Sequence, residues 1–157
     1  MTYDVSFETV EAKPFIGVAD NAARNEIGQV IRAGLDKVWS LIRATPEIGT
    51  PGSSVVLYAP APGNRLAMWP GVYIDSGYLG SGEVSRYETP AGSVAHVVYM
   101  GPYDRMMEAH RAAQQAGLAN GGLTGLSWEV YGDHEPDPAR LRTDIYYQIG
   151  PAAGADH

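Results

Sequence analysis

A single carboxylate stands in the middle of an apolar and aromatic strand-like stretch, Ser127-Trp128-Glu129-Val130-Tyr131. An acid at such a position is either solvated on the outer face of a sheet or held in a pocket, where an unpaired buried charge would cost several kcal/mol. Strict alternation places Glu129 on the same strand face as Ser127 and Tyr131, and Trp128 on the other face. Periodicity alone favours the solvated acid, because carboxylates are rarely buried unless they are paired.

The aromatic composition supplies material for the pocket alternative. Ten Tyr and three Trp accompany only two Phe, and rings with polar atoms suit a site that stacks on flat molecules and attracts cations. Trp69 and Tyr73 share one face of a predicted strand, as do Tyr147 and Ile149. For any single Tyr, a place at the edge of the core with its hydroxyl in water is the better interpretation, so only the set points to a binding site.

Other reactive groups give no comparable pattern. The chain has no Cys, and its four histidines show no His-x-x-x-His pairing: His96, His110, His134 and His157. We therefore expect no metal site and no cofactor. His110 lies on an apolar helical stripe and is predicted to be a core histidine with one hydrogen-bond partner. No Gly-x-Ser-x-Gly elbow supports a serine nucleophile.

The elements that must position these residues follow from hydrophobic spacing and turn residues. Each predicted helix has one apolar face. The first helix has Asn25 as a plausible N-cap and ends before Pro46, and the second has Tyr103, Met106, Met107, His110 and Ala113 as its inner stripe. The predicted elements are a strand over 5–18 broken by Pro14, a helix over about 27–42, strands over 54–59 and 66–74, a strand over 83–100 kinked at Pro90, a helix from Tyr103, and strands over 126–131 and 143–149.

The two halves share one order of elements: strand, helix, strand, strand. Ser54-Val55-Val56-Leu57-Tyr58 aligns with the stretch that contains Glu129, which indicates a duplication with repeats at about 3–76 and 83–150. The predicted fold is α+β: duplicated β-α-β-β units that form an antiparallel sheet with two main helices and a pseudo-twofold central cleft. One ligand-binding domain over residues 1–151 and a flexible tail over 152–157 are expected.

The charge and composition of the chain limit the classes of partner that it is expected to bind. The formal charge of −7 comes without a basic block, so nucleic acid and anionic membranes are poor partners, whereas a cation would be attracted. No apolar run approaches the roughly 20 residues of a membrane span. We expect a soluble, cytoplasmic protein that binds neither nucleic acid nor membrane directly; the oligomeric state stays open.

Four segments in order carry a resemblance: Pro90-Ala91-Gly92, Gly101-Pro102-Tyr103-Asp104, Trp128-Glu129-Val130-Tyr131 and Thr143-Asp144-Ile145-Tyr146. Together they resemble the gyrase-inhibitor-like small-molecule-binding family, also known as the effector-binding domain of multidrug-responsive transcription activators. The resemblance implies a central cleft that binds bulky, flat, often cationic aromatic compounds, with a glutamate at its floor among aromatic rings. The matching position here is Glu129.

The first hypothesis is a stand-alone module that binds and sequesters or senses such compounds. Glu129 would supply the countercharge. The residues expected to line the ligand are Trp39, Trp69, Tyr73, His96, Tyr99, Tyr131 and Tyr147. No helix-turn-helix region is attached, so the role of a complete transcription factor is unsupported.

The second hypothesis is a hydrolase that opens cyclopropane-bearing, DNA-alkylating natural products, as some stand-alone family members are thought to do. Glu129 would act as base and a Tyr, here Tyr99, as acid or orienting donor. Tyr99 stands where relatives often carry His, which leaves that proton transfer in question. A third hypothesis, a gyrase-inhibitor-like protein-interaction module, ranks lowest because the acidic residues are dispersed rather than clustered.

Overall fold

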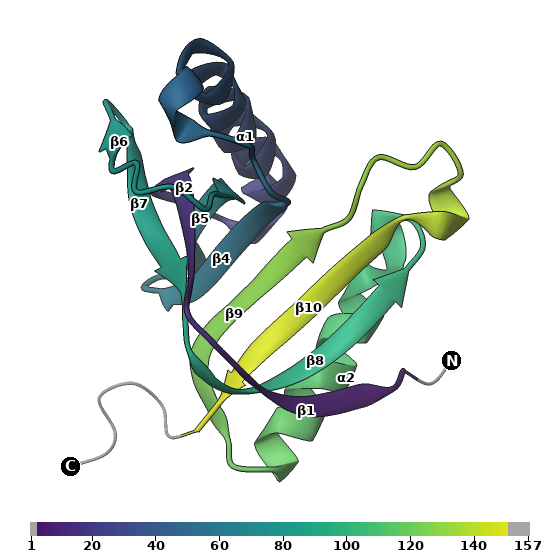
Figure 1. Ribbon diagram of the computed structural model, residues 1–157. Helices are drawn as coiled ribbons and strands as arrows, with labels where there is room; N and C mark the ends of the chain where they lie inside the picture. The colour runs from purple at the N-terminus through teal and green to yellow at the C-terminus, as the bar shows by residue number, and fades with distance from the viewer. Residues whose placement is uncertain (1–2, 151–157) are drawn as a thin grey trace, which may run out of the picture. The chain divides into compact units, whose positions relative to one another are not determined.

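The computed structural model describes residues 3–150, which form an α+β fold with two α-helices and antiparallel strands (Figure 1). The expected tail over 152–157 lies outside this range. The elements are β1 (Val5–Val10), β2 (Lys13–Val18), β3 (Asp20–Ala22), α1 (Ile27–Ala44), β4 (Ser54–Ala61), β5 (Arg65–Tyr73), β6 (Gly80–Ser81), β7 (Val84–Thr89), β8 (Gly92–Met100), α2 (Met106–Ala119), β9 (Leu123–Tyr131) and β10 (Arg142–Ile149).

The chain divides into two compact units. Unit 1 comprises the residues up to Glu11 together with those from Pro90 onward, and unit 2 comprises Ala12–Thr89. In unit 1 the strands lie in the order β9-β10-β8-β1, and in unit 2 in the order β4-β5-β2-β7, with the short strands β6 beside β7 and β3 beside β5. The two orders correspond strand for strand, which agrees with the duplicated element order of the sequence.

Each unit takes its last strand from the other half of the chain. β1 pairs with β8 in unit 1, and β7 pairs with β2 in unit 2. The chain passes between units at Glu11-Ala12 and Thr89-Pro90, so the predicted first strand is broken before Pro14 rather than at it. Pro14 sits inside β2, opposite Glu88, and β5 pairs with β2 only from Phe15 onward. The Pro14 carbonyl still accepts a hydrogen bond from the N–H of Ile74, directly after β5, so the missing N–H falls at the end of the β2–β5 ladder, where proline is tolerated.

Helix α1 packs on β5 and β2 of unit 2 and closes an apolar core around Ile16, Val38 and Val72. The helix begins after a 3-10 turn over Arg24–Glu26, and the Glu26 carboxylate accepts a hydrogen bond from the backbone N–H of Ala23. Asn25, the expected N-cap, lies within that turn instead. Because an acid whose side chain returns to the backbone can satisfy free N–H groups at a helix start, no Asn cap is needed.

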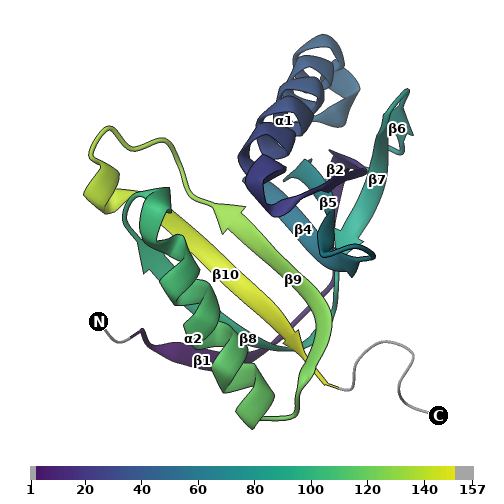
Figure 2. The ribbon, with the colours of Figure 1, turned by 180° about the vertical axis from the view of Figure 1, so that it is seen from behind.

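Helix α2 packs on β8 and β10 of unit 1 (Figure 2). Its fully buried residues are Ala109, Ala113 and Gly117. Tyr103 and Met107, which the apolar pattern placed on the inner stripe, are both 55% exposed. Small residues allow a helix to approach a sheet closely, whereas large side chains at the contact would hold it away. The inner face of α2 is therefore rotated from the predicted one, and Met106 and His110 remain at its edge.

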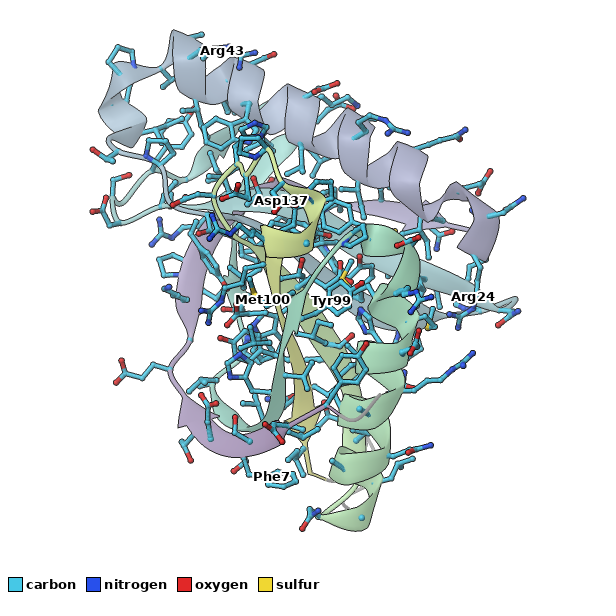
Figure 3. All side chains as sticks on the ribbon, turned by 90° about the vertical axis from the view of Figure 1, so that its right-hand side faces the viewer. Phe7, Arg24, Arg43, Tyr99, Met100 and Asp137 are labelled. Carbon is cyan, nitrogen blue, oxygen red and sulfur yellow. The ribbon has the colours of Figure 1, made fainter. Side chains whose placement is uncertain are left out.

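Strand alternation then decides which residues meet α2. In Figure 3, Tyr99 lies on the side of β8 toward α2 and Met100 lies on the opposite side. Tyr99 packs with Val97, Ile145 and Ala109 in the core of unit 1, while Met100 is exposed. Neither helix within the described residues is long and apolar enough to span a bilayer.

Candidate functional site

Glu129 lies on the helix-covered face of unit 1. In the β9–β10 ladder Glu129 is opposite Ile145, and Ile145 belongs to the core beneath α2. Residues directly opposite each other in an antiparallel pair share a face. The Glu129 residue is only 6% exposed. The buried alternative is therefore correct for this acid, although alternation alone favoured the solvated one.

Both oxygens of the Glu129 carboxylate accept hydrogen bonds. The hydroxyl of Tyr131 donates to Oε1 at 2.6 Å, and Nε2 of His110, from α2, lies 2.6 Å from Oε2. Nδ1 of His110 lies 2.7 Å from the hydroxyl oxygen of Tyr147, which also accepts a bond of 3.1 Å from Nε2 of Gln114. Two strands and one helix thus hold a continuous polar chain in an otherwise apolar layer. Such a chain offsets the cost of burying the carboxylate.

His110 is the functional candidate that sequence reasoning missed. It was predicted to have one hydrogen-bond partner, and it has two. The available signal was the presence of one titratable residue on an apolar helical stripe and one acid on an apolar strand. Predicting that the two residues pair requires knowing how α2 is positioned against β9. Neither the helical spacing of α2 nor the alternation of β9 gives this position.

Thr143 adds an unusual feature to the same face. It is opposite Tyr131 on β9 and opposite Tyr99 on β8. Its side chain is fully buried, and its hydroxyl has no hydrogen-bond partner among the described residues. A buried hydroxyl without a partner costs about 1–3 kcal/mol. This face of unit 1 therefore carries polar groups that packing alone would not select.

Tyr99, the predicted acid of the hydrolase hypothesis, shares this face but is engaged elsewhere. Its hydroxyl donates a short hydrogen bond to the backbone carbonyl of Pro102, in the turn that precedes α2. Tyr131 and Tyr147, by contrast, belong to the chain that contains Glu129. The geometry brings three of the predicted residues together and gives Tyr99 a role at the start of α2.

His96 lies on the opposite face of the unit 1 sheet. Its ring stacks on Tyr146 at 4.3 Å, and Tyr146 stacks on Trp128 at 5.3 Å. Nδ1 of His96 lies 2.6 Å from Glu8 of β1, and Nε2 lies 2.8 Å from Asp144 of β10. Because ionised carboxylates only accept, both ring nitrogens carry hydrogen, and His96 is an imidazolium that bridges three strands.

The charges in this bridge reinforce one another. The hydrogen bond to Asp144 raises the pKa of His96 against the opposing effect of burial, and Glu8 raises it further. Burial alone would raise the pKa of Asp144, but hydrogen bonds from His96 and Arg142, with their charges, lower it to about 2. The pKa of Glu8 is lowered by its hydrogen bonds with Ser6 and His96.

The remaining predicted residues belong to unit 2. On α1, Nε1 of Trp39 donates to the Ser54 hydroxyl at 3.4 Å. Tyr73 donates to the Thr89 hydroxyl, and burial raises the pKa of Tyr73. Trp69 and Tyr73 belong to a cluster of rings on the sheet face that points away from α1; the rings of this cluster are Phe15, Trp69, Tyr73 and Tyr87. Lys13 lies over the Tyr73 ring at 4.6 Å, so that ring already faces a cation.

No group of three His, Asp or Glu side chains within residues 3–150 is arranged to hold a metal ion. The chemistry on offer is that of a buried carboxylate, an imidazole and tyrosine hydroxyls. This set can bind a cation, or it can hold and transfer a proton.

Comparison with known proteins gives a fold. No family model matches the sequence, and no curated protein matches it. Among solved structures, the C-terminal domain of EcmrR aligns with a TM-score of 0.74 at 15% identity over 97% of this chain and 100% of that one. EcmrR in its complex with DNA aligns with a TM-score of 0.80 at 18% identity over 96% of this chain. This protein spans only 58% of that longer EcmrR chain.

The chain has the gyrase-inhibitor-like effector-binding fold. Two further structures share this fold. SAV2435 bound to tetraphenylphosphonium aligns with a TM-score of 0.59 at 14% identity, over 92% of each chain. A hydrolase encoded by lin2189 from Listeria innocua aligns with a TM-score of 0.58 at 10% identity, over 92% of this chain and 91% of that one. The expected family resemblance is thereby confirmed at the level of the fold.

Proposed function

We propose that this protein binds bulky aromatic cations, with the Glu129 carboxylate as the countercharge. The observation that carries the proposal is the burial of that carboxylate, with 6% exposure, among tyrosine hydroxyls and an imidazole. Packing alone would favour an apolar residue at this buried position, so the presence of an acid supports a functional role. SAV2435, which has the same fold, was solved with a cationic aromatic compound bound.

The aromatic neighbours suit the same class of ligand. Tyr131 and Tyr147 lie within the polar chain of Glu129, and tyrosine rings attract cations through their faces. The net charge of −7 favours the approach of a cation at long range. Binding would sequester or sense such a compound, in accordance with the first hypothesis from the sequence.

The test uses a pair of ions of matched size and opposite charge, tetraphenylphosphonium and tetraphenylborate. Calorimetric titration of the wild-type protein should give binding of the cation and none of the anion. Glu129→Gln keeps the shape of the side chain and removes its charge, and it should weaken cation binding at least about tenfold, or about 1.4 kcal/mol. Equal affinities of wild type and variant for the cation would refute the countercharge role.

A second candidate is the hydrolase of electrophilic cyclopropanes. The hydrogen bond between Glu129 and His110 favours it, because an acid paired with an imidazole is a common arrangement for activating water. In this reaction Glu129 takes a proton from water and the water oxygen forms a bond to a ring carbon. The strained C–C bond breaks, and its electron pair passes to the conjugated acceptor, which is then protonated.

Mass spectrometry of a cyclopropane-bearing compound incubated with the protein would separate the two candidates. Hydrolysis requires a product heavier by one water that forms with wild type and not with Glu129→Gln. An unchanged compound that nevertheless binds would leave the first candidate standing alone.

A further inference from the structure

His110 is the group of α2 that contacts the acid of unit 1. Its imidazole is 13% exposed and the Glu129 side chain 7% exposed, so both partners are largely removed from water. Nε2 lies 2.6 Å from Oε2 of Glu129, while Nδ1 lies 2.7 Å from the Tyr147 hydroxyl. The ring meets the Tyr147 ring edge-on at 5.7 Å. The imidazole is therefore fixed at both nitrogens.

Hydrogen accounting settles one of these positions. With Glu129 ionised, as the proposed countercharge role requires, the hydrogen in its contact with His110 belongs to Nε2, because a carboxylate has no hydrogen to donate. Tyr131 donates to the other carboxylate oxygen. Both carboxylate oxygens thus have internal donors, and the imidazole stands against Oε2 at a position that a cation could otherwise take.

We propose that the His110 imidazole holds the ligand's position at the Glu129 carboxylate in the free protein, and that a ligand binds by displacing the imidazole. This inference rests on the proposed function of the same site. Replacement makes the site selective for charge. A neutral aromatic compound that removed the imidazole would leave a buried carboxylate short of a donor, whereas a cation compensates the lost hydrogen bond with its own charge.

The selectivity follows from differential affinity. A ligand shifts an equilibrium between two arrangements only by as much as it prefers one of them. When His110 is in place, the hydrogen bonds of the Glu129 carboxylate are already satisfied. A ligand that only fits the site by shape therefore does not displace the imidazole, and the ligand must also carry a positive charge. His110 therefore sets a threshold that excludes uncharged aromatic compounds of similar size.

His110→Phe tests the proposal, because it keeps a ring of similar size and removes the donor. The variant's free form holds a poorly satisfied carboxylate, so it should be less stable than wild type yet bind tetraphenylphosphonium about tenfold or more tightly. The ligand should also raise its melting temperature by more than it raises that of wild type. His134→Phe, the same change at an exposed position in the loop between β9 and β10, should leave the affinity unchanged.

A measurement on wild type covers the case in which His110→Phe fails to fold. The hydrogen on Nε2 of His110 can be followed by nitrogen-correlated NMR of the histidine rings. Titration with tetraphenylphosphonium should shift or remove that signal in proportion to saturation, and tetraphenylborate should not. If wild type does not bind the cation, the proposed function itself fails. If wild type binds it while the His110 signal stays unchanged, or if His110→Phe binds equally or less tightly, only the displacement of His110 is overturned.

Discussion

The two units have the same order of strands but differ in the polarity of their interiors. Val56 of β4 is opposite Pro70 in unit 2, and Glu129 of β9 is opposite Ile145 in unit 1. By the strand-for-strand correspondence, Val56 occupies the place of Glu129, and it is fully buried in an apolar layer. An identical framework therefore folds around either residue. The fold does not require the acid, and its presence in only one of the two units points to function.

A second pair of equivalent positions repeats the contrast. Thr143 of unit 1 corresponds to Met68 of unit 2. Thr143 lies two residues before Ile145, which is opposite Glu129, and Met68 lies two residues before Pro70, which is opposite Val56. Met68 is fully buried and apolar, whereas the buried Thr143 hydroxyl has no partner among the described residues. Unit 2 thus has the interior expected of a stabilising core. Unit 1 has given up part of that stabilisation for polar groups on its helix-covered face.

The largest expected effect comes from placing the acid in the wrong unit. Val56→Glu puts a carboxylate into an interior that has Tyr58 at the place of Tyr131 but no histidine to pair with the new acid, because all four histidines lie outside Ala12–Thr89. An unpaired buried charge should lower the free energy of unfolding by about 3–5 kcal/mol. Urea unfolding at neutral pH measures the loss.

Val56→Gln is the control for the size and polarity of the new side chain. It should cost less than Val56→Glu at neutral pH, and the difference should shrink in acid as the glutamic acid becomes neutral. Equal costs for the two variants at neutral pH would mean that unit 2 can solvate or pair a charge at this position. The two interiors would then differ in their residues but not in their ability to accommodate a buried charge.

A smaller loss of stability is expected from glycine-to-alanine substitutions that test how closely each helix packs on its sheet. A methyl group added at Gly34 of α1 would overlap the ring of Pro70, while one added at Gly117 of α2 would meet the tip of Leu123. The proline ring cannot turn aside, whereas a leucine side chain can change rotamer. Gly34→Ala should therefore cost about 1–3 kcal/mol from overpacking.

Gly117→Ala should be neutral or slightly stabilising. The gain of up to about 1 kcal/mol in helix propensity offsets the adjustment of Leu123. Thermal unfolding of the two variants under one set of conditions gives the comparison. A loss at Gly117 equal to that at Gly34 would show that α2 is as tightly fitted as α1.

The sequence predicted most of the individual elements because their signals are local. Alternation, helical spacing and turn residues located the helices and most of the strands, and they placed Glu129 and Tyr131 on one face. Three features depend on contacts between distant segments and were missed. These are the exchange of β1 and β7, the rotated inner face of α2, and the pairing of Glu129 with His110.

The ring cluster of unit 2 shows the same limit. Trp69 and Tyr73 were correctly placed on one strand face, yet periodicity does not say which face a helix will cover. Their face turns out to point away from α1. His96 was likewise grouped with Glu129, although the two lie on opposite faces of one sheet. Only the register between strands separates them.

The smallest expected effect concerns the two exchanged strands. β1 is tied to β8 and β10 by the His96 imidazolium between Glu8 and Asp144. In unit 2, β7 carries Arg86, which donates to the carbonyls of Ser76 and Tyr78. Arginine keeps its charge throughout the accessible pH range, whereas histidine does not. The edge of unit 1 should therefore respond to pH, and that of unit 2 should not.

The sign follows from the direction of each shift. The pKa of His96 in the folded protein is raised above its usual 6.5, so the stabilisation from the bridge is complete below that pH and is lost as pH rises through the raised value. The pKa of Asp144 is lowered from 3.8 to about 2, so its contribution is present above 3.8 and is lost as pH falls through about 2. The bridge is strongest between these limits and weakens as the pH rises through the raised pKa of His96.

Hydrogen exchange of the backbone amides, corrected for the intrinsic pH dependence of the exchange rate, measures this response. Raising the pH from about 6 to about 9 should reduce the protection of the β1–β8 ladder by about 1 kcal/mol or less, because Glu8 is substantially exposed and its pairing is screened. Protection of the β2–β7 ladder should stay constant. His96→Gln should remove the pH dependence of β1, and a dependence that survives this substitution would mean that another group controls the edge of unit 1.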